Sequence, residues 1–133
     1  MGSMIHRLQR IVQEVNRAPD IDNALLLITE SLTRDLSAEA CTIFLTQKDE
    51  PDTLLLQACS GLNPEIIGTV KRKLGEGLVG TIAARAEAMN LVDAPAHPKF
   101  MLVPDSGETD FPIMLGVPIM AHREVLGVIA VQR

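Results

Sequence analysis

The last two apolar runs of the sequence constrain the fold more than any other feature. Residues 113–121 and 125–132 are joined by a tight three-residue link, and each run is apolar at odd and even positions alike. A strand that faces water on one side alternates apolar and polar residues, whereas a strand covered on both sides does not. The two runs therefore predict an antiparallel hairpin within a sheet that is covered on both faces.

Two amphipathic helices are predicted ahead of the strands. Apolar residues recur every three or four positions in the segments 5–15 and 21–36, which are separated by a Pro-Asp pair. The carboxylate of this aspartate, Asp20, can cap the second helix. Leu26 and Leu27 widen the apolar face of that helix, so we expect it to be well buried.

Short apolar runs bounded by turn residues predict the remaining elements. The expected strands are 40–46, 53–59, 69–74 and 88–92, and a short helix is expected at 77–86. The two N-terminal helices can cover one face of the resulting sheet. The segment between the fourth strand and the closing hairpin must then help to cover the other face.

Length and composition limit the classes of function. The chain has 133 residues, and Met1-Gly2-Ser3 resembles an expression scar, so we expect one domain over 4–133. The 12 basic and 17 acidic residues give a net charge of −5, and there are three aromatic rings, all Phe. This balance excludes the basic, ring-rich surface that nucleic-acid binding needs. No apolar stretch is long enough to span a membrane, and no signal peptide is present, so a soluble cytoplasmic domain is expected.

The segment from Asp93 to Pro112, called the lid below, is unusually long for a connection in a small domain. It holds four of the eight prolines and two of the three rings, Phe100 and Phe111. Loops of this length often close over a ligand, although an inert cover of the core is the alternative. His97, within the lid, suits either hydrogen bonding to an anionic ligand or a hydrogen bond that fixes the loop.

A glycine-rich segment, Gly75-Glu-Gly-Leu-Val-Gly80, fits the dinucleotide-binding pattern G-x-G-x-x-G. The strand before it is rich in Lys and Arg, and no second βαβ half follows, so the structural context of that motif is missing. We interpret these glycines as allowing a sharp strand-to-helix turn and close packing of the helix on the sheet. Free N–H groups at the start of the helix can still attract a carboxylate or phosphate.

No catalytic or metal-binding constellation is evident. Cys41 and Cys59 lie in apolar runs with no His or Cys nearby, as buried structural thiols do. His6 and His122 are expected to be solvated, and Ser106 lacks the strand-to-helix context of a nucleophile. We therefore expect no cofactor, no metal and no enzymatic activity within this chain.

The order of elements resembles that of a GAF domain, and the segments that carry the resemblance span 4–133. They are the glycine-rich segment with the Thr-Ile-Ala-Ala-Arg that follows, Met89-Asn-Leu-Val-Asp-Ala, Leu115-Gly-Val-Pro-Ile and Val125-Leu-Gly-Val-Ile-Ala-Val. The lid motif Asn90-Leu-Val-Asp-Ala-Pro-Ala-His-Pro-Lys-Phe, together with the opening Met4-Ile-His-Arg-Leu-Gln-Arg, is similar to one subgroup. This subgroup is the N-terminal regulatory domain of enzyme I of nitrogen-related phosphotransferase systems, which is a phosphoenolpyruvate–protein phosphotransferase.

The resemblance implies an α+β fold with a six-stranded antiparallel sheet, N-terminal helices on one face and a short helix plus the lid on the other. It also implies a fragment of a longer bacterial chain, in which the domain controls downstream phosphotransferase domains in response to nitrogen status. Glutamine and 2-oxoglutarate are the suspected signals, and many such domains form dimers through terminal helices. The phosphorylated histidine belongs to segments outside this sequence.

We expect a small polar metabolite to bind between the sheet and the lid. Apolar residues would exclude water, and charged lid groups would orient the ligand. The predicted ligand-binding residues are Asp93, His97, Phe100, Glu108 and Phe111 of the lid, above a floor of Cys41, Ile43 and Val117. Two alternatives stay open: an interaction module without ligand that forms a homodimer through the first helix, and a GAF-type methionine sulfoxide reductase. The scarcity of rings argues against purine and bilin ligands.

Overall fold

The structure is a computed structural model that describes residues 21–133. Four predictions lie outside the described residues: the expression scar, the first helix with its dimer contact, the Asp20 cap and the environment of His6.

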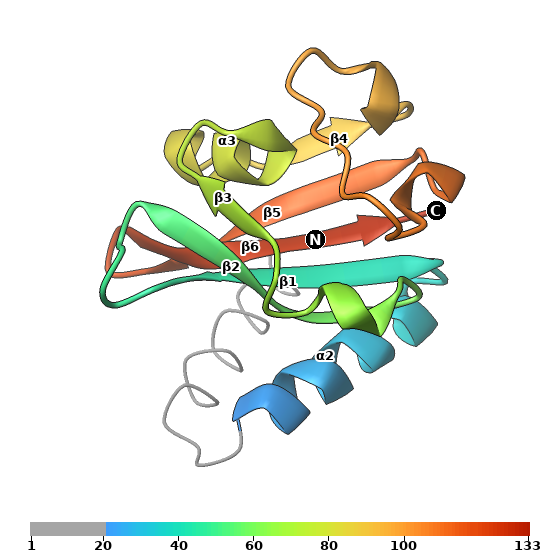
Figure 1. The fold of residues 1–133 in the computed structure, drawn as a ribbon, viewed down its shortest axis with the longest axis horizontal. Helices are drawn as coiled ribbons and strands as arrows, with labels where there is room; N and C mark the ends of the chain where they lie inside the picture. Colours follow the sequence, from blue (N-terminus) through green and yellow to red (C-terminus); the bar gives the residue numbers. More distant parts are fainter. Residues whose placement is uncertain (1–20) are drawn as a thin grey trace.

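A single six-stranded sheet organises the described chain (Figure 1). Its strand order is β3-β2-β1-β6-β5-β4, and every neighbouring pair is antiparallel. The helices and strands, in chain order, are α2 (Ile21–Asp35), β1 (Ala40–Thr46), β2 (Thr53–Ser60), η1 (Pro64–Ile66), β3 (Lys71–Lys73), α3 (Gly77–Arg85), β4 (Met89–Leu91), η2 (Ala94–Ala96), η3 (Glu108–Asp110), β5 (Met114–Ala121) and β6 (Glu124–Gln132). This arrangement confirms the α+β class, the six strands and the two helices predicted for this range. The two edge strands, β3 and β4, are shorter than predicted.

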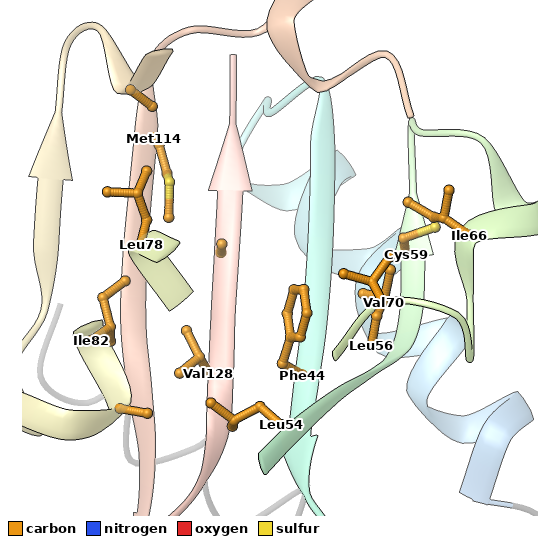
Figure 2. Packing of buried hydrophobic residues seen from close by; sticks show 13 residues of the cluster. Phe44, Leu54, Leu56, Cys59, Ile66, Val70, Leu78, Ile82, Met114 and Val128 are labelled. Atoms are coloured by element: carbon orange, nitrogen blue, oxygen red, sulfur yellow. The ribbon is translucent and has the colours of Figure 1, made fainter. Parts of the chain in front are cut away.

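The sheet is covered on both faces, as the closing hairpin predicts. Helix α2 lies on one face, whereas α3 lies on the other, with the lid on the same side (Figure 1). The central strand β6 has consecutive buried residues that point in opposite directions: Val128 and Ala130 join the core beneath α3, and Ile129 joins the core beneath α2. Figure 2 shows Phe44, Val128 and Met114 projecting to the α3 side from three neighbouring strands. A strand in this position needs apolar residues at odd and even positions alike, because both of its faces are covered.

Helix α2 is buried along a narrower stripe than predicted. Leu25, Thr29 and Leu32 are buried against the sheet, and their spacing of three to four residues puts them on one helical face. Leu26 and Leu27, in contrast, are 36% and 62% exposed. The expectation that these two leucines widen the buried face is therefore wrong, because both lie outside the stripe of Leu25, Thr29 and Leu32.

The glycine-rich segment forms a sharp turn into α3, as interpreted from the sequence. Gly75 and Gly77 have backbone φ values of +81° and +67°, which residues other than glycine rarely adopt. At Gly80 the constraint is contact: a Cβ atom there would lie 2.2 Å from the carbonyl oxygen of Lys73. The missing side chain lets α3 approach β3 directly, and this close approach places α3 over the sheet.

Candidate functional site

A small cavity of about 50 Å³ lies between the sheet and the cover formed by α3 and the lid. Its floor comes from the strands, and its walls come from α3, the lid and the segment around η1. The lining residues are Thr42, Phe44, Leu56, Leu62, Ile66, Arg72, Leu78, Val79, Ala94, Phe100, Met101, Val103, Glu108, Met114, Ala130 and Gln132. Most of these side chains are apolar, so the few polar groups among them decide what the cavity can recognise.

Two ionisable groups of opposite charge line the cavity: the Glu108 carboxylate from the lid and the Arg72 guanidinium from β3. Burial raises the pKa of Glu108, while a hydrogen bond from the Val103 N–H and the positive charge of Arg72 act in the opposite direction. That hydrogen bond is short, with 2.6 Å between the Val103 nitrogen and Oε1 of Glu108. The carboxylate is thus held in a fixed place within a largely apolar site.

Hydrogen bonds from neighbouring residues fix the short η3 turn that carries Glu108. The Glu108 N–H donates to Oγ of Ser106 at 3.1 Å, and Ser106 is buried. From the sheet side, Nε2 of Gln132 donates to the carbonyl oxygens of Glu108 at 3.3 Å and Phe111 at 3.0 Å. The lid is therefore attached to the last strand of the sheet through a side-chain amide.

The structure brings only some of the predicted lid residues to the cavity. Phe100 and Glu108 line it, whereas Asp93, His97 and Phe111 are not among its lining residues. Asp93 is exposed at the start of η2 and makes no capping hydrogen bond with its side chain. Nδ1 of His97 accepts a hydrogen bond from the Lys99 N–H at 3.0 Å, which corresponds to the loop-fixing interpretation of this residue.

The predicted floor needs a correction. Cys41, Ile43 and Val117 are all buried, but they belong to the core beneath α2, on the face of the sheet opposite the cavity. The residues that form the floor from β1 are Thr42 and Phe44, one position away. Strand β1 is buried at six consecutive positions, so its sequence holds no alternation that indicates which residues face the lid.

Arg72 and Gln132 also line the cavity, and neither residue was predicted from the sequence. Arg72 lies in a Lys-Arg-Lys run that looks like an ordinary solvated edge strand. Gln132 had a detectable signal, because it is a polar residue that continues the inward alternation of Val128 and Ala130 on β6. A buried amide at such a position needs hydrogen-bond partners, and those partners turn out to be in the lid.

The two cysteines are buried free thiols of low reactivity. Burial raises the pKa of Cys41 to about 12, with a smaller contribution from Cys59, and burial also raises the pKa of Cys59. The two side chains belong to the cores on opposite faces of the sheet, and neither lines the cavity. Because the thiolate is the nucleophile, this environment argues against a cysteine-based reductase.

Residues 21–133 contain neither a metal-binding cluster nor a membrane-spanning helix. No group of three or more His, Cys, Asp or Glu side chains in this range could hold a metal ion. In the same range, no helix has the length and apolar character needed to cross a bilayer.

Comparison with known proteins assigns the family. The sequence model of the GAF domain matches residues 4–133, which is nearly the whole chain. The chain belongs to the GAF domain family. A phosphoenolpyruvate-dependent phosphotransferase system protein of Escherichia coli K12 is 36% identical over 122 residues, which cover 92% of this chain and 16% of that protein. The GAF domain therefore spans about one sixth of the length of this curated relative.

Two solved GAF domains are similar in both sequence and fold. One is the GAF domain of a phosphoenolpyruvate–protein phosphotransferase from Coxiella burnetii, with 39% identity, a TM-score of 0.78 and coverage of 97% of this chain and 77% of that one. The other is the corresponding domain from Acinetobacter, with 36% identity, a TM-score of 0.74 and coverage of 95% and 73%. The cavity described above is thus a feature of a GAF domain similar to those of phosphoenolpyruvate–protein phosphotransferases.

Proposed function

We propose that this GAF domain is a cytoplasmic sensor that binds a small polar metabolite and thereby controls a phosphoenolpyruvate–protein phosphotransferase in the same chain. Two observations support this proposal. The relatives with the same domain are phosphotransferase proteins, and the E. coli relative is about six times longer than the matched segment. The cavity also offers charged groups that a buried core would not require. The domain itself carries no chemistry in this proposal.

The pair of opposite charges in the cavity is the observation that indicates which class of ligand binds there. Arg72 can bind a carboxylate, and the Glu108 carboxylate can bind an ammonium group, so together they match the two charges of an α-amino acid. Between the two suspected signals, this pair favours glutamine over 2-oxoglutarate. The second carboxylate of 2-oxoglutarate would have to approach Glu108, and like charges in a partly buried site repel each other.

The volume of the cavity implies that the lid moves when the ligand binds. About 50 Å³ is far below the roughly 300–1,000 Å³ of pockets that hold drug-sized ligands. Helix α3 packs directly on β3 at Gly80, whereas the lid combines a few apolar contacts, from Ala94, Phe100 and Val103, with hydrogen bonds to its surroundings. We therefore infer that the lid shifts outward to admit the metabolite and closes again over it.

Isothermal titration calorimetry with glutamine and 2-oxoglutarate tests this proposal. We expect glutamine to bind more tightly, and we expect Arg72→Gln to weaken glutamine binding about ten- to a hundred-fold through loss of a charge-assisted hydrogen bond. Lys71→Gln is the matched control, since this exposed neighbour pairs with Glu50 outside the cavity. No heat from either metabolite at millimolar concentration would refute the sensor hypothesis for this domain.

The small volume also supports a second candidate, an interaction module whose cavity stays filled by its own side chains. Regulation would then depend on contacts between copies of the domain and not on a metabolite. Analytical ultracentrifugation distinguishes the two candidates: a monomer at high protein concentration would contradict a module that acts through self-association. A glutamine-dependent calorimetric signal from the same sample would favour the sensor.

A further inference from the structure

Gln132 occupies a distinctive place in this domain. It is the last residue of β6, only 7% of it is exposed, and it lines the cavity beneath the lid. Apolar residues fill the preceding inward positions of the strand, Val128 and Ala130. A long amide side chain at the next such position is costly to bury unless its polar atoms find partners. The location of those partners indicates what the residue does.

The side chain of Gln132 spans the two ends of η3. Its Nε2 donates to the carbonyl oxygens of Glu108 and Phe111, which bound this short turn. Because both partners are carbonyls, only the amide nitrogen can serve as the donor, which fixes the orientation of the amide. Glu108 in turn presents its carboxylate to the cavity. One side chain thus connects the sheet to the turn that carries the acidic ligand-binding group.

The backbone of the same residue connects to two further segments. Its carbonyl oxygen accepts a hydrogen bond from the Glu39 N–H at 2.8 Å, in the connection between α2 and β1. The next residue, Arg133, exchanges hydrogen bonds of 2.9 and 3.1 Å with Ile113 at the start of the closing hairpin. If the lid is displaced and moves the Gln132 side chain, the end of β6 and the α2–β1 connection are therefore expected to move with it.

We propose that Gln132 is a positioning residue that couples the state of the lid to the end of β6 and to the α2–β1 connection. This inference rests on the proposed function, and it names the route by which an occupied cavity is detected outside it. Outward movement of η3 breaks or lengthens the two hydrogen bonds of the Gln132 amide, and the end of β6 then becomes less ordered. When the lid closes, these hydrogen bonds form again and the end of β6 becomes ordered with it. A merely structural Gln132 would stabilise the lid without making these two regions respond to each other.

A ligand-free double-mutant cycle, followed by hydrogen exchange of backbone amides, tests the coupling. Ser106→Ala removes the acceptor of the Glu108 N–H and loosens η3 without touching Gln132. We expect it to speed exchange about fivefold at the lid amide of Phe111 and at the amides of Glu39 and Arg133. In a Gln132→Met background, Ser106→Ala is expected to speed exchange at Phe111 only. An equal effect on Glu39 and Arg133 in both backgrounds, or none in either, would overturn the proposal.

The control and the ligand-bound experiment separate this inference from the proposed function. Gln47→Met is the matched control, since Nε2 of Gln47 donates to the carbonyl of Leu45 two residues away, and this bond does not reach the lid. If Gln132→Met does not fold, Gln132→Asn carries the same cycle with its amide withdrawn by one methylene group. With saturating glutamine, we expect protection of the Arg133 amide in the parent protein and not in the Gln132 variant. Failure of glutamine to bind removes the proposed function, whereas the ligand-free cycle decides the coupling by itself.

Discussion

Replacing Glu108 with Gln should weaken ligand binding and stabilise the folded domain at the same time. Glutamine at this position retains an oxygen that accepts the Val103 N–H, so the lid keeps this hydrogen bond. The substitution removes only the negative charge. In the proposed complex, the ammonium group of the ligand loses its ionic partner, which is worth about 1.5–3 kcal/mol for a charge-assisted hydrogen bond. The dissociation constant for glutamine should therefore rise about ten- to a hundred-fold.

The effect on stability depends on pH, and its sign follows from the raised pKa of Glu108. The ordinary pKa of the group is 4.5, and burial raises it in the folded domain. Between these two pKa values the folded state binds more protons than the unfolded state, so the free energy of unfolding falls as the pH rises. Above the raised pKa, the parent domain has lost all of this stability, whereas the Glu108→Gln variant has no ionisable group at this position and loses none of it. The stability advantage of the variant should thus grow from pH 4.5 upward and then level off.

Thermal unfolding measured from pH 4 to pH 8, combined with calorimetric titration of glutamine, checks both effects. Asp110→Asn is the matched control, because this exposed acid lies on the same turn and does not line the cavity. It should leave the binding constant for glutamine unchanged. A Glu108→Gln variant whose advantage shrinks as the pH rises would refute the electrostatic reasoning. Unchanged glutamine affinity would refute the assignment of Glu108 to the ligand.

Three further substitutions test the described geometry. Gly80→Ala should lower the free energy of unfolding in urea by about 1–3 kcal/mol, because its Cβ would lie 2.2 Å from the carbonyl oxygen of Lys73. Ile43→Val should cost about 0.5–1.5 kcal/mol of stability and leave glutamine affinity unchanged, since Ile43 packs beneath α2. Phe44→Leu, one residue along, should weaken calorimetric glutamine binding about tenfold by removing apolar contact in the cavity. Cys41, with a pKa of about 12, should react with a thiol reagent at pH 8 only after unfolding, and fast labelling of the native protein would contradict its burial.

The sequence was sufficient for the fold because its strongest signals come from burial. The apolar closing hairpin predicted a sheet covered on both faces, and β6 has that environment. The 3.6-residue period of α2 and the role of the glycines before α3 follow from the sequence for similar reasons, since each reflects a local steric or periodic requirement, although Leu26 and Leu27 lie outside the buried stripe of α2. Edge strands β3 and β4 were overextended, because their ends depend on pairing with a neighbour and not on composition.

The candidate site was harder to predict because it depends on which way side chains point. Strand β1 is covered on both faces and buried at six consecutive positions, so Cys41 and Ile43 could not be distinguished from Thr42 and Phe44 by pattern alone. Loop residues have no periodicity at all. Within the lid, Glu108 faces the cavity while His97 bonds to its own loop, and this difference arises from hydrogen bonds between segments distant in sequence.

The order of the strands has a consequence for how the domain is synthesised. Of the six strands in this sheet, β6 is synthesised last, yet it lies between β1 and β5 in the middle of the sheet. Until its residues 124–132 emerge, β1 and β2 cannot join β5 and β4, and apolar surface on both halves stays open to solvent. Sheets that depend on non-local pairing of this kind fold slowly, and incomplete chains with exposed apolar surface are prone to aggregate. A nascent chain that stalls a few residues short of Gln132 should therefore depend on chaperones, whereas one released just beyond it can complete its sheet.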